Sequence, residues 1–190
     1  PKVLIIAGSD SGGGAGIQAD IKTTSYFNGY AMTAITAITA QNTIGVQSIY
    51  HLPKEIVMEQ INSITTDLSP DIVKIGMLAD LDIIEYISKK ISNYKIVLDP
   101  VMVATSGDVL VSDEVVSSIK NNLINKSFLI TPNIYEAEIL SENKINCLED
   151  QIEAGKNLLK LGCKHVLVKG GHGNSDVIND VLITSSGDEY

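Results

Sequence analysis

The chain has 190 residues, the size of one ordinary domain, and 44% hydrophobic and 19% charged residues, as in globular rather than disordered proteins. Its net charge of −9 argues against a nucleic-acid-binding surface, because neutralising phosphates requires clustered cations. The sequence contains lysines but no arginine, so any bound anion would be held by lysine, metal and backbone amides.

The two cysteines, Cys147 and Cys163, lack the spacing of a metal site and are typical of a reduced protein with incidental thiols. No segment has the length and hydrophobicity of a membrane span, and the first residues lack the basic and then apolar pattern of a signal peptide. We therefore expect a soluble protein of the cytoplasm, with neither nucleic acid nor a membrane as its partner.

Short hydrophobic runs recur along the chain and predict β-strands. The expected strands cover residues 2–7, 31–39, 46–50, 72–75, 95–98, 128–131, 165–168 and 181–184. Most are continuous rather than alternating runs, which is typical of parallel strands covered on both faces. Residues 46–50 follow the preceding strand too closely for an intervening helix, so this segment is expected to pair antiparallel or to form a flap.

Hydrophobic residues spaced three and four apart predict helices between most of these strands. The periodicity marks residues 17–21, 56–64, 83–91, 115–123 and 152–161, and Gly162 is expected to end the last helix. Strands alternating with helices predict a three-layer α/β fold around a mainly parallel sheet. Because no internal repeat or linker is visible, residues 1–190 are expected to form one domain.

A glycine cluster, GSDSGGGAGIQAD at residues 8–20, lies between the first strand and the first helix. Glycines let the backbone approach a ligand closely, and the helix that follows would direct N–H groups into the same space. The phosphate-binding P-loop and the dinucleotide fingerprint do not fit, because Lys22 comes too late and the glycine spacing is wrong by one. Asp10 and Asp20 would suit a metal ion or a donor-rich ligand. A glycine-rich turn without a ligand is the alternative.

Polar or glycine-containing segments follow five of the later strands, at residues 40–43, 76–78, 99–102, 132–136 and 169–172. Ligands of open α/β sheets bind at the carboxyl ends of the strands. Each segment also has an ordinary interpretation, since Gln41 or Asp99 could shape a turn and Lys169 could be solvated. Asn133 with Glu136 could simply form a helix capping box. The joint placement of the five segments favours a ligand site.

Six motifs together resemble the hydroxymethylpyrimidine and phosphomethylpyrimidine kinases of thiamine biosynthesis, which belong to the ribokinase-like superfamily. They are GSDSGGGAGIQAD (8–20), AQNTIGVQ (40–47), KIGML (74–78), LDPVM (98–102), TPNIYE (131–136) and KGGH (169–172). The resemblance implies a ribokinase-like α/β/α sandwich. It also implies ATP- and Mg²⁺-dependent phosphorylation of 4-amino-5-hydroxymethyl-2-methylpyrimidine and its monophosphate, by a homodimer.

The resemblance also implies roles for individual residues. Gln41 would hydrogen-bond the aminopyrimidine edge, because an amide offers a donor and an acceptor side by side. The remaining substrate-binding residues would be Gly8, Asp20, Met77, Val101 and Met102. Lys169 and Asn133 would bind ATP. Glu136 and Asp99 would hold Mg²⁺, which prefers hard oxygen ligands.

One departure from the family concerns the catalytic residue. Family members continue into a Gly-Thr-Gly-Cys segment that forms an anion hole, whereas this sequence ends at Tyr190. Neither Cys147 nor Cys163 lies in such a context, so the catalytic cysteine is expected beyond Tyr190 and no catalytic residue is assigned within residues 1–190. Two alternatives stay open: a pyridoxal-type kinase on the same fold, and a non-catalytic pyrimidine-binding module.

Overall fold

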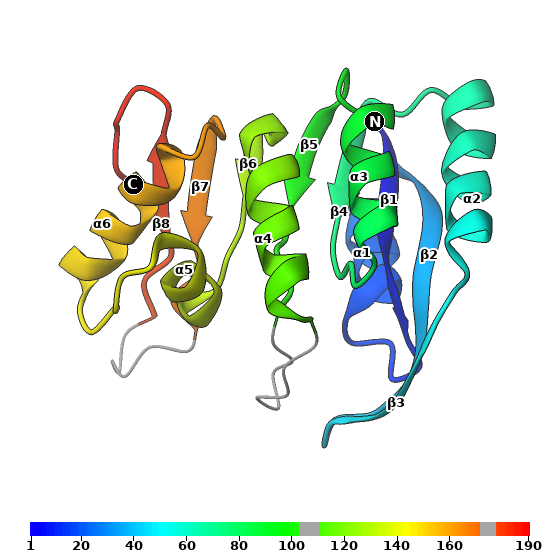
Figure 1. Cartoon of the computed structure of the whole chain (residues 1–190), viewed down its shortest axis with the longest axis horizontal. Coiled ribbons are helices and arrows are strands. Elements are labelled where there is room, and N and C mark those ends of the chain that lie inside the picture. Colours follow the sequence, from blue (N-terminus) through cyan, green and yellow to red (C-terminus); the bar gives the residue numbers. More distant parts are fainter. Residues whose placement is uncertain (103–110, 172–177) are drawn as a thin grey trace.

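A computed structural model of the chain describes residues 1–102, 111–171 and 178–190. These residues contain an eight-stranded sheet in the order β3-β2-β1-β4-β5-β6-β7-β8 (Figure 1). The strands are β1 (Lys2–Asp10), β2 (Tyr30–Gln41), β3 (Val46–His51), β4 (Ile72–Ile75), β5 (Lys95–Leu98), β6 (Leu129–Ile130), β7 (His165–Val168) and β8 (Val181–Thr184). All eight predicted strands are therefore confirmed, four of them with the expected bounds.

The sheet is mainly parallel, as predicted. The six strands from β2 to β7 in the sheet order pair in parallel, and only the two edge strands of the described sheet run the other way. The edge strand β3 pairs antiparallel with β2, and β8 pairs antiparallel with β7. The antiparallel pairing considered for residues 46–50 is thus confirmed. It follows from the short turn after Gln41, which leaves no room for a crossover helix.

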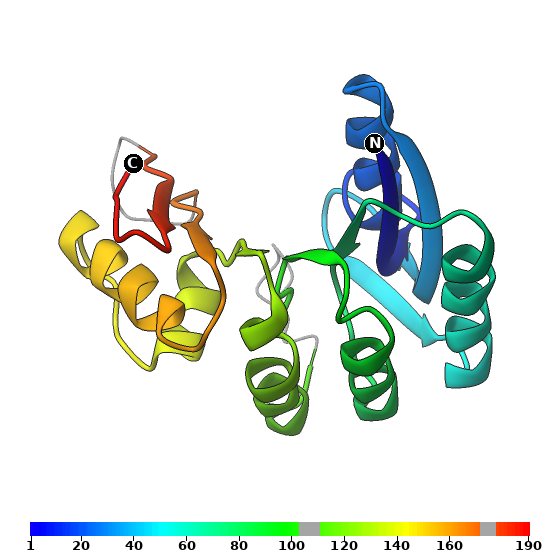
Figure 2. The same ribbon diagram turned by 90° about the horizontal axis from the view of Figure 1, so that it is seen from above.

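Helices pack on both faces of the sheet. They are α1 (Gly16–Tyr26), α2 (Lys54–Asp67), α3 (Leu81–Lys90), α4 (Asp113–Asn122), α5 (Ile134–Ser141) and α6 (Leu148–Leu159), with a 3₁₀ turn at Ile124–Lys126. Figure 2 shows α1 on one side of the sheet and α2, α3, α4 and α6 on the other. Hydrophobic periodicity did not mark the helix α5, but the capping box considered at Asn133 and Glu136 is confirmed as its start.

The alternation of side chains along β1 explains how this strand contributes to a hydrophobic core on each face of the sheet. Leu4 and Ile6 belong to the large core beneath α2 to α6, whereas Ile5 and Ala7 pack with Ile17 of α1 in a smaller one. Successive side chains of a strand point to opposite faces, so one hydrophobic run supplies both cores. The three-layer α/β arrangement is confirmed here.

Farther along the sheet the two faces differ. On β5 to β8 the buried residues alternate with more exposed ones, of which Val97, Leu129, Leu167 and Leu182 are hydrophobic and half-buried. These four lie on the α1 side of the sheet, and the helices described next to β5–β8 cover the other side (Figure 2). The hydrophobic runs predicted strands covered on both faces, so this half of the sheet corrects that expectation for the described residues.

Local signals fix the helix ends. Asp80 caps α3 by accepting a hydrogen bond from the Ile83 N–H, and Lys89 and Lys90 occupy its last turn. Gly162 has a φ of 105° and its N–H donates to Leu159 O, so it ends the turn that follows α6, close to its predicted place. None of the helices in the three described ranges has the length and hydrophobicity needed to cross a bilayer.

Candidate functional site

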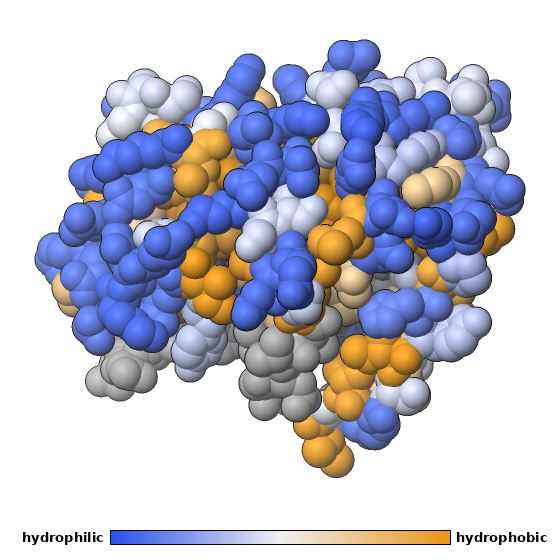
Figure 3. All heavy atoms as spheres, viewed as in Figure 1, coloured by the Kyte–Doolittle hydropathy of each residue, from blue (hydrophilic) through white to orange (hydrophobic). Residues whose placement is uncertain are grey.

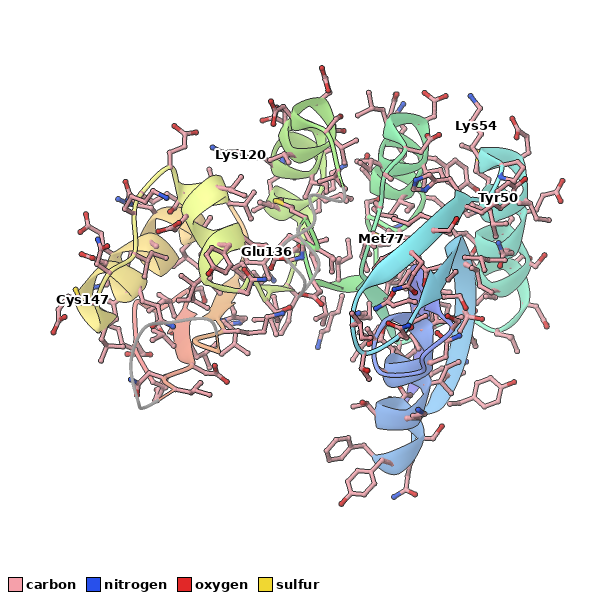
Figure 4. The ribbon with its side chains drawn as sticks, turned by 90° about the horizontal axis from the view of Figure 1, so that it is seen from below. Tyr50, Lys54, Met77, Lys120, Glu136 and Cys147 are labelled. Atoms are coloured by element: carbon pink, nitrogen blue, oxygen red, sulfur yellow. The ribbon has the colours of Figure 1, made fainter. Side chains whose placement is uncertain are left out.

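A pocket of about 470 Å³ opens at the carboxyl ends of the central strands. Figure 4 views this edge of the sheet, with Met77 beside the N-terminal strands and Glu136 on α5. The pocket brings together the end of nearly every parallel strand, as expected for an open α/β sheet. Its lining comprises Ala7, Gly8, Ser9, Asp10, Ala15, Gly16, Ala19, Asp20, Thr39, Gln41, Val46, Ile49, Lys74, Gly76, Met77, Asp99, Val101, Asn133, Glu136, Lys169 and Gly171.

The glycine loop forms one wall, and Asp10 organises it. The buried Asp10 carboxylate accepts hydrogen bonds from the N–H groups of Gly12 (2.7 Å), Gly14 (2.9 Å) and Ala15 (2.8 Å). Asp10 was expected to suit a metal ion or a donor-rich ligand. Its carboxylate is engaged by these three amides of its own loop, and Asp10 also lines the pocket. The expectation that the N–H groups of α1 point into the site stays a prediction.

Two glycines of this wall are required by close packing. Gly16 has a φ of 55°, and a Cβ there would overlap the carbonyl oxygen of Gly8. At Gly8 a Cβ would lie 3.0 Å from the Met77 Cε, so glycine leaves the room that the methionine side chain occupies. Thr36 holds the same methionine from β2 by donating to Met77 O at 3.0 Å. The wall is therefore shaped by backbone contacts.

Gln41 stands at the end of β2, where the register shifts before the turn to β3. Its backbone N–H donates to the Ser11 hydroxyl at 2.8 Å, and the hydroxyl donates back to Gln41 O at 2.8 Å. Its side-chain Oε1 accepts a hydrogen bond from Thr39 Oγ1 at 3.1 Å. Asn42 accepts from the Ile44 N–H and shapes the turn itself. Within the AQNT motif, Gln41 thus lines the pocket while Asn42 has a local role.

Charged side chains form the opposite wall. Lys74 Nζ lies 2.7 Å from Asp20 Oδ2 and 4.0 Å from Asp99 Oδ2. Lys169 Nζ lies 2.9 Å from Asp99 Oδ1, which also accepts from Thr131 Oγ1 at 3.3 Å. The four ionised groups make a row of alternating sign from α1 to the end of β7.

Glu136 belongs to a capping box at the start of α5. Asn133 Oδ1 accepts from the Glu136 N–H at 2.9 Å, and Glu136 Oε2 accepts from the Asn133 N–H at 2.8 Å. The other oxygen, Oε1, accepts from the Met102 N–H at 3.3 Å. Burial raises the pKa of Glu136 to about 7, with the Asn133 N–H opposing the shift and the charge of Asp99 adding to it. Asn133 and Glu136 therefore form the capping box that was considered as their ordinary interpretation, and both residues also line the pocket.

Hydrogen bonds from neighbouring segments hold the end of β7 in place. Lys169 N donates to Pro132 O at 2.8 Å and pairs with Asn133 in an isolated parallel bridge. The buried Gln151 of α6 donates through Nε2 to Val168 O and Asn179 O, both at 2.9 Å. These contacts bring the TPNIYE and KGGH motifs side by side. His172, the last residue of the second motif, lies outside the described residues.

The pocket gathers the predicted substrate, nucleotide and metal residues, except one. Met102 is buried and does not line the cavity, although its N–H reaches Glu136. Lys74 is a lining residue to which the sequence assigned no role. The sequence feature that could have identified Lys74 is its position as a lysine inside an otherwise hydrophobic strand.

The remaining candidate residues are the two cysteines and the side chains able to bind a metal. Cys147 is exposed and Cys163 is buried, where burial raises its pKa to about 11. Neither cysteine lines the pocket. Among the described residues, no three or more histidine, cysteine, aspartate or glutamate side chains gather closely enough to hold a metal ion alone.

Comparison with known proteins gives one consistent family. The model of the family described as phosphomethylpyrimidine kinase matches residues 10–190. A hydroxymethylpyrimidine/phosphomethylpyrimidine kinase of Bacillus subtilis (strain 168) is 48% identical over 189 residues, which are 97% of this chain and 70% of that protein.

Two solved structures are similar over the whole chain. The phosphomethylpyrimidine kinase of Clostridium difficile 630 has a TM-score of 0.90 and 43% identity, and the match covers 100% of this chain and 83% of that one. A Bacillus subtilis pyridoxal kinase, solved as an ADP complex, has a TM-score of 0.89 and 36% identity, covering 100% of this chain and 73% of that one.

Proposed function

The chain belongs to the phosphomethylpyrimidine kinase family, and on that premise we propose that its pocket binds 4-amino-5-hydroxymethyl-2-methylpyrimidine or its monophosphate together with ATP. The enzyme is a phosphotransferase with a ribokinase-like fold. The acceptor oxygen forms a bond to the γ-phosphorus while the bond to the β,γ-bridging oxygen breaks. For the hydroxymethyl substrate, the hydroxyl proton passes to water as the bond to phosphorus forms, and ADP leaves. The observation that carries this proposal is the pairing of a neutral wall with a charged wall in one pocket.

The neutral wall suits the pyrimidine ring. Gly8, Met77 and Val101 offer glycine backbone and apolar side chains, against which a flat ring can pack. Gln41 supplies an amide at the same wall, and an aminopyrimidine edge presents the matching donor and acceptor. Asp20, across the pocket, is held by Lys74.

The charged wall suits the phosphates. Lys169 is the cation nearest to Asn133 and Glu136, and its ammonium can attract the nucleotide phosphates. Phosphoryl transfer depends mainly on positioning and on neutralising charge, which lysine and backbone amides can provide without arginine.

The donor set at this wall fits Mg²⁺. This ion commonly takes one or two carboxylates together with phosphate oxygens and water, so a cluster of three protein ligands is not required. The Asp99 side chain is 23% exposed and would bind the ion directly. Glu136 is 2% exposed and both its oxygens accept backbone N–H groups, so it would orient the ion's water ligands. Bound there, Mg²⁺ supplies neutralisation of the phosphate charge.

The protein's assembly and location are part of the proposal. The β2–β3 hairpin exposes Ile38, Ile44 and Tyr50, and exposed hydrophobic groups of this kind mark interaction surfaces. Figure 3 shows hydrophobic residues at the surface where β3 ends. We assign this surface to a second copy of the chain, which sedimentation at micromolar concentration would test. The unpaired cysteines fit the reducing cytoplasm.

The substrate assignment is tested by turnover. ADP release is measured with the pyrimidine, its monophosphate and pyridoxal, alone and in competition. The likeness to a pyridoxal kinase makes pyridoxal the second candidate substrate. Faster turnover of pyridoxal would overturn the pyrimidine assignment. Tight pyrimidine binding without ADP release would instead support the binding module.

Gln41→Ala tests the ring contact. Removing the amide leaves the ring's polar edge without its partner, and we expect KM for the pyrimidine to rise about 10- to 100-fold. Gln47→Ala is the matched control, because Gln47 is exposed on the same hairpin and bonds Gly45 O. Equal effects of the two substitutions would contradict the role of Gln41.

A further inference from the structure

Lys74 is an unusual residue for the centre of a sheet. It lies on β4 between Ile5 of β1 and Val97 of β5, and its side chain is 21% exposed. Lysine is seldom buried to this extent unless it is paired. The substrate and nucleotide roles proposed above leave it without a function.

The ammonium group of Lys74 lies between the two subsites. It forms an ion pair with Asp20 on α1, and Asp99 Oδ2 is 4.0 Å away at the end of β5. Asp20 is one of the predicted substrate-binding residues, whereas Asp99 is bonded to Lys169 and is a predicted metal ligand. One cation therefore stands next to a carboxylate from each predicted subsite.

The space around this group is kept small. A Cβ at Gly76 would lie 3.3 Å from Lys74 Nζ and 3.0 Å from the Ala7 Cβ. Glycine at position 76 thus leaves the room that the ammonium occupies, and the neighbouring strands confine it. The ammonium thus lies within 4.0 Å of both carboxylates, in a space that its neighbours limit.

The charges of the pocket make this cation important. Asp10 is neutralised within its loop by three amides, whereas Asp20 and Asp99 depend on lysines. Lys74 and Lys169 are the lysines among the described lining residues. Without Lys74, Asp20 would lose its ion pair, and the repulsion between Asp20 and Asp99 would be left without the cation that lies between them.

We propose that Lys74 is a positioning residue that couples the two subsites, an inference that rests on the proposed function. When a ligand engages Asp99, the ammonium is left to Asp20 alone and fixes that carboxylate for the pyrimidine. By linkage, pyrimidine binding strengthens nucleotide binding by the same factor. The two ligands therefore bind with positive cooperativity through one shared cation.

Calorimetry tests the coupling directly. The Kd of 4-amino-5-hydroxymethyl-2-methylpyrimidine is measured without and with a saturating non-hydrolysable ATP analogue and Mg²⁺. We expect about 5- to 100-fold tighter binding with the analogue in the unchanged protein. In Lys74→Met, which keeps the chain length and removes the charge, we expect less than about a twofold difference.

Matched variants separate coupling from general damage. Lys22→Met removes another lysine of the loop region, whose Nζ donates to Gly13 O, and should keep the full coupling. Lys74→Arg retains the charge and should restore part of it. If Lys74→Met does not unfold cooperatively, Asp20→Asn removes the carboxylate instead and should also abolish the coupling.

The outcomes distinguish the two claims. Binding of both ligands with equal coupling in the unchanged protein and in Lys74→Met would overturn the role of Lys74 and leave the proposed function standing. Binding of both ligands without any coupling in the unchanged protein would do the same. If the unchanged protein bound neither ligand, the proposed function itself would be overturned, and the inference with it.

Discussion

The two walls of the pocket hold their carboxylates in different ways. On the glycine-loop wall, Asp10 is satisfied by three backbone N–H groups of its own loop. On the opposite wall, Asp99 is satisfied by the side chains of Lys169 and Thr131, and Glu136 is buried beside it. The first wall is therefore fixed by backbone groups, whereas the second depends on contacts between charged and polar side chains. The glycine-loop wall therefore sets the shape of the pocket, and the opposite wall sets its charge.

The largest effect is expected on the shaped wall, from Gly16→Ala. The new Cβ would overlap Gly8 O, and the residue would keep a φ of 55°, so we expect a loss of about 3–5 kcal/mol in the free energy of unfolding. Gly187→Ala is the control, because Gly187 has a φ of 84° but open space around it, and about 1 kcal/mol is expected. Urea denaturation measures both. Equal losses would show that strain alone, without the overlap, explains the wall.

The charged wall should respond to pH through Glu136. In the folded protein the pKa of Glu136 is about 7, above its ordinary value of 4.5. Its contribution to stability is thus complete below pH 4.5 and is lost as the pH rises to about 7. The expected loss is about 3 kcal/mol.

Urea denaturation between pH 4.5 and 8, without nucleotide or Mg²⁺, tests this expectation. Glu136→Gln keeps the shape and the capping box but has no charge to titrate, so its stability relative to the unchanged protein should improve across this range. A constant difference between the two proteins over the whole range would show that folding does not raise the pKa of Glu136.

The smallest effect is expected from Thr36→Val on the shaped wall. The substitution removes the hydrogen bond to Met77 O, at a cost of about 1 kcal/mol, and should raise KM for the pyrimidine about two- to fivefold. Thr66→Val is the control, since Thr66 is exposed and bonds only within its own helix. If both variants left KM unchanged, Met77 would not depend on Thr36 for its place.

Much of this molecule could be predicted from local pattern. The strand Ile72–Ile75 has the predicted bounds because its β-branched run lies between a Pro-Asp turn and Gly76, which leaves few alternatives. The strand at Leu129–Ile130 is shorter than predicted, although Phe128 N and Thr131 N still donate to β5. The pocket residues were predictable because they follow strands whose carboxyl ends meet at one edge.

Three features depended on the path of the chain and were not predicted. The partners of Asp10 are amides of its own loop, which only the folded loop brings together. Lys74 lies within a strand rather than after it, so a search for polar residues that follow the strands does not find it. The half-buried residues Val97 and Leu129 show that a hydrophobic run does not tell how many of its faces are covered.

The absence of arginine from the sequence bears on how one pocket can serve two successive reactions. A guanidinium group grips an oxyanion in one planar, two-pronged orientation, whereas an ammonium attracts equally from all sides and turns its three donors freely. With lysines rather than arginines as its cations, the described pocket presents no planar, two-pronged group to a phosphate. A neutral alcohol and its own phosphate ester can therefore occupy the same cavity in turn, without a rearrangement of the binding site for each.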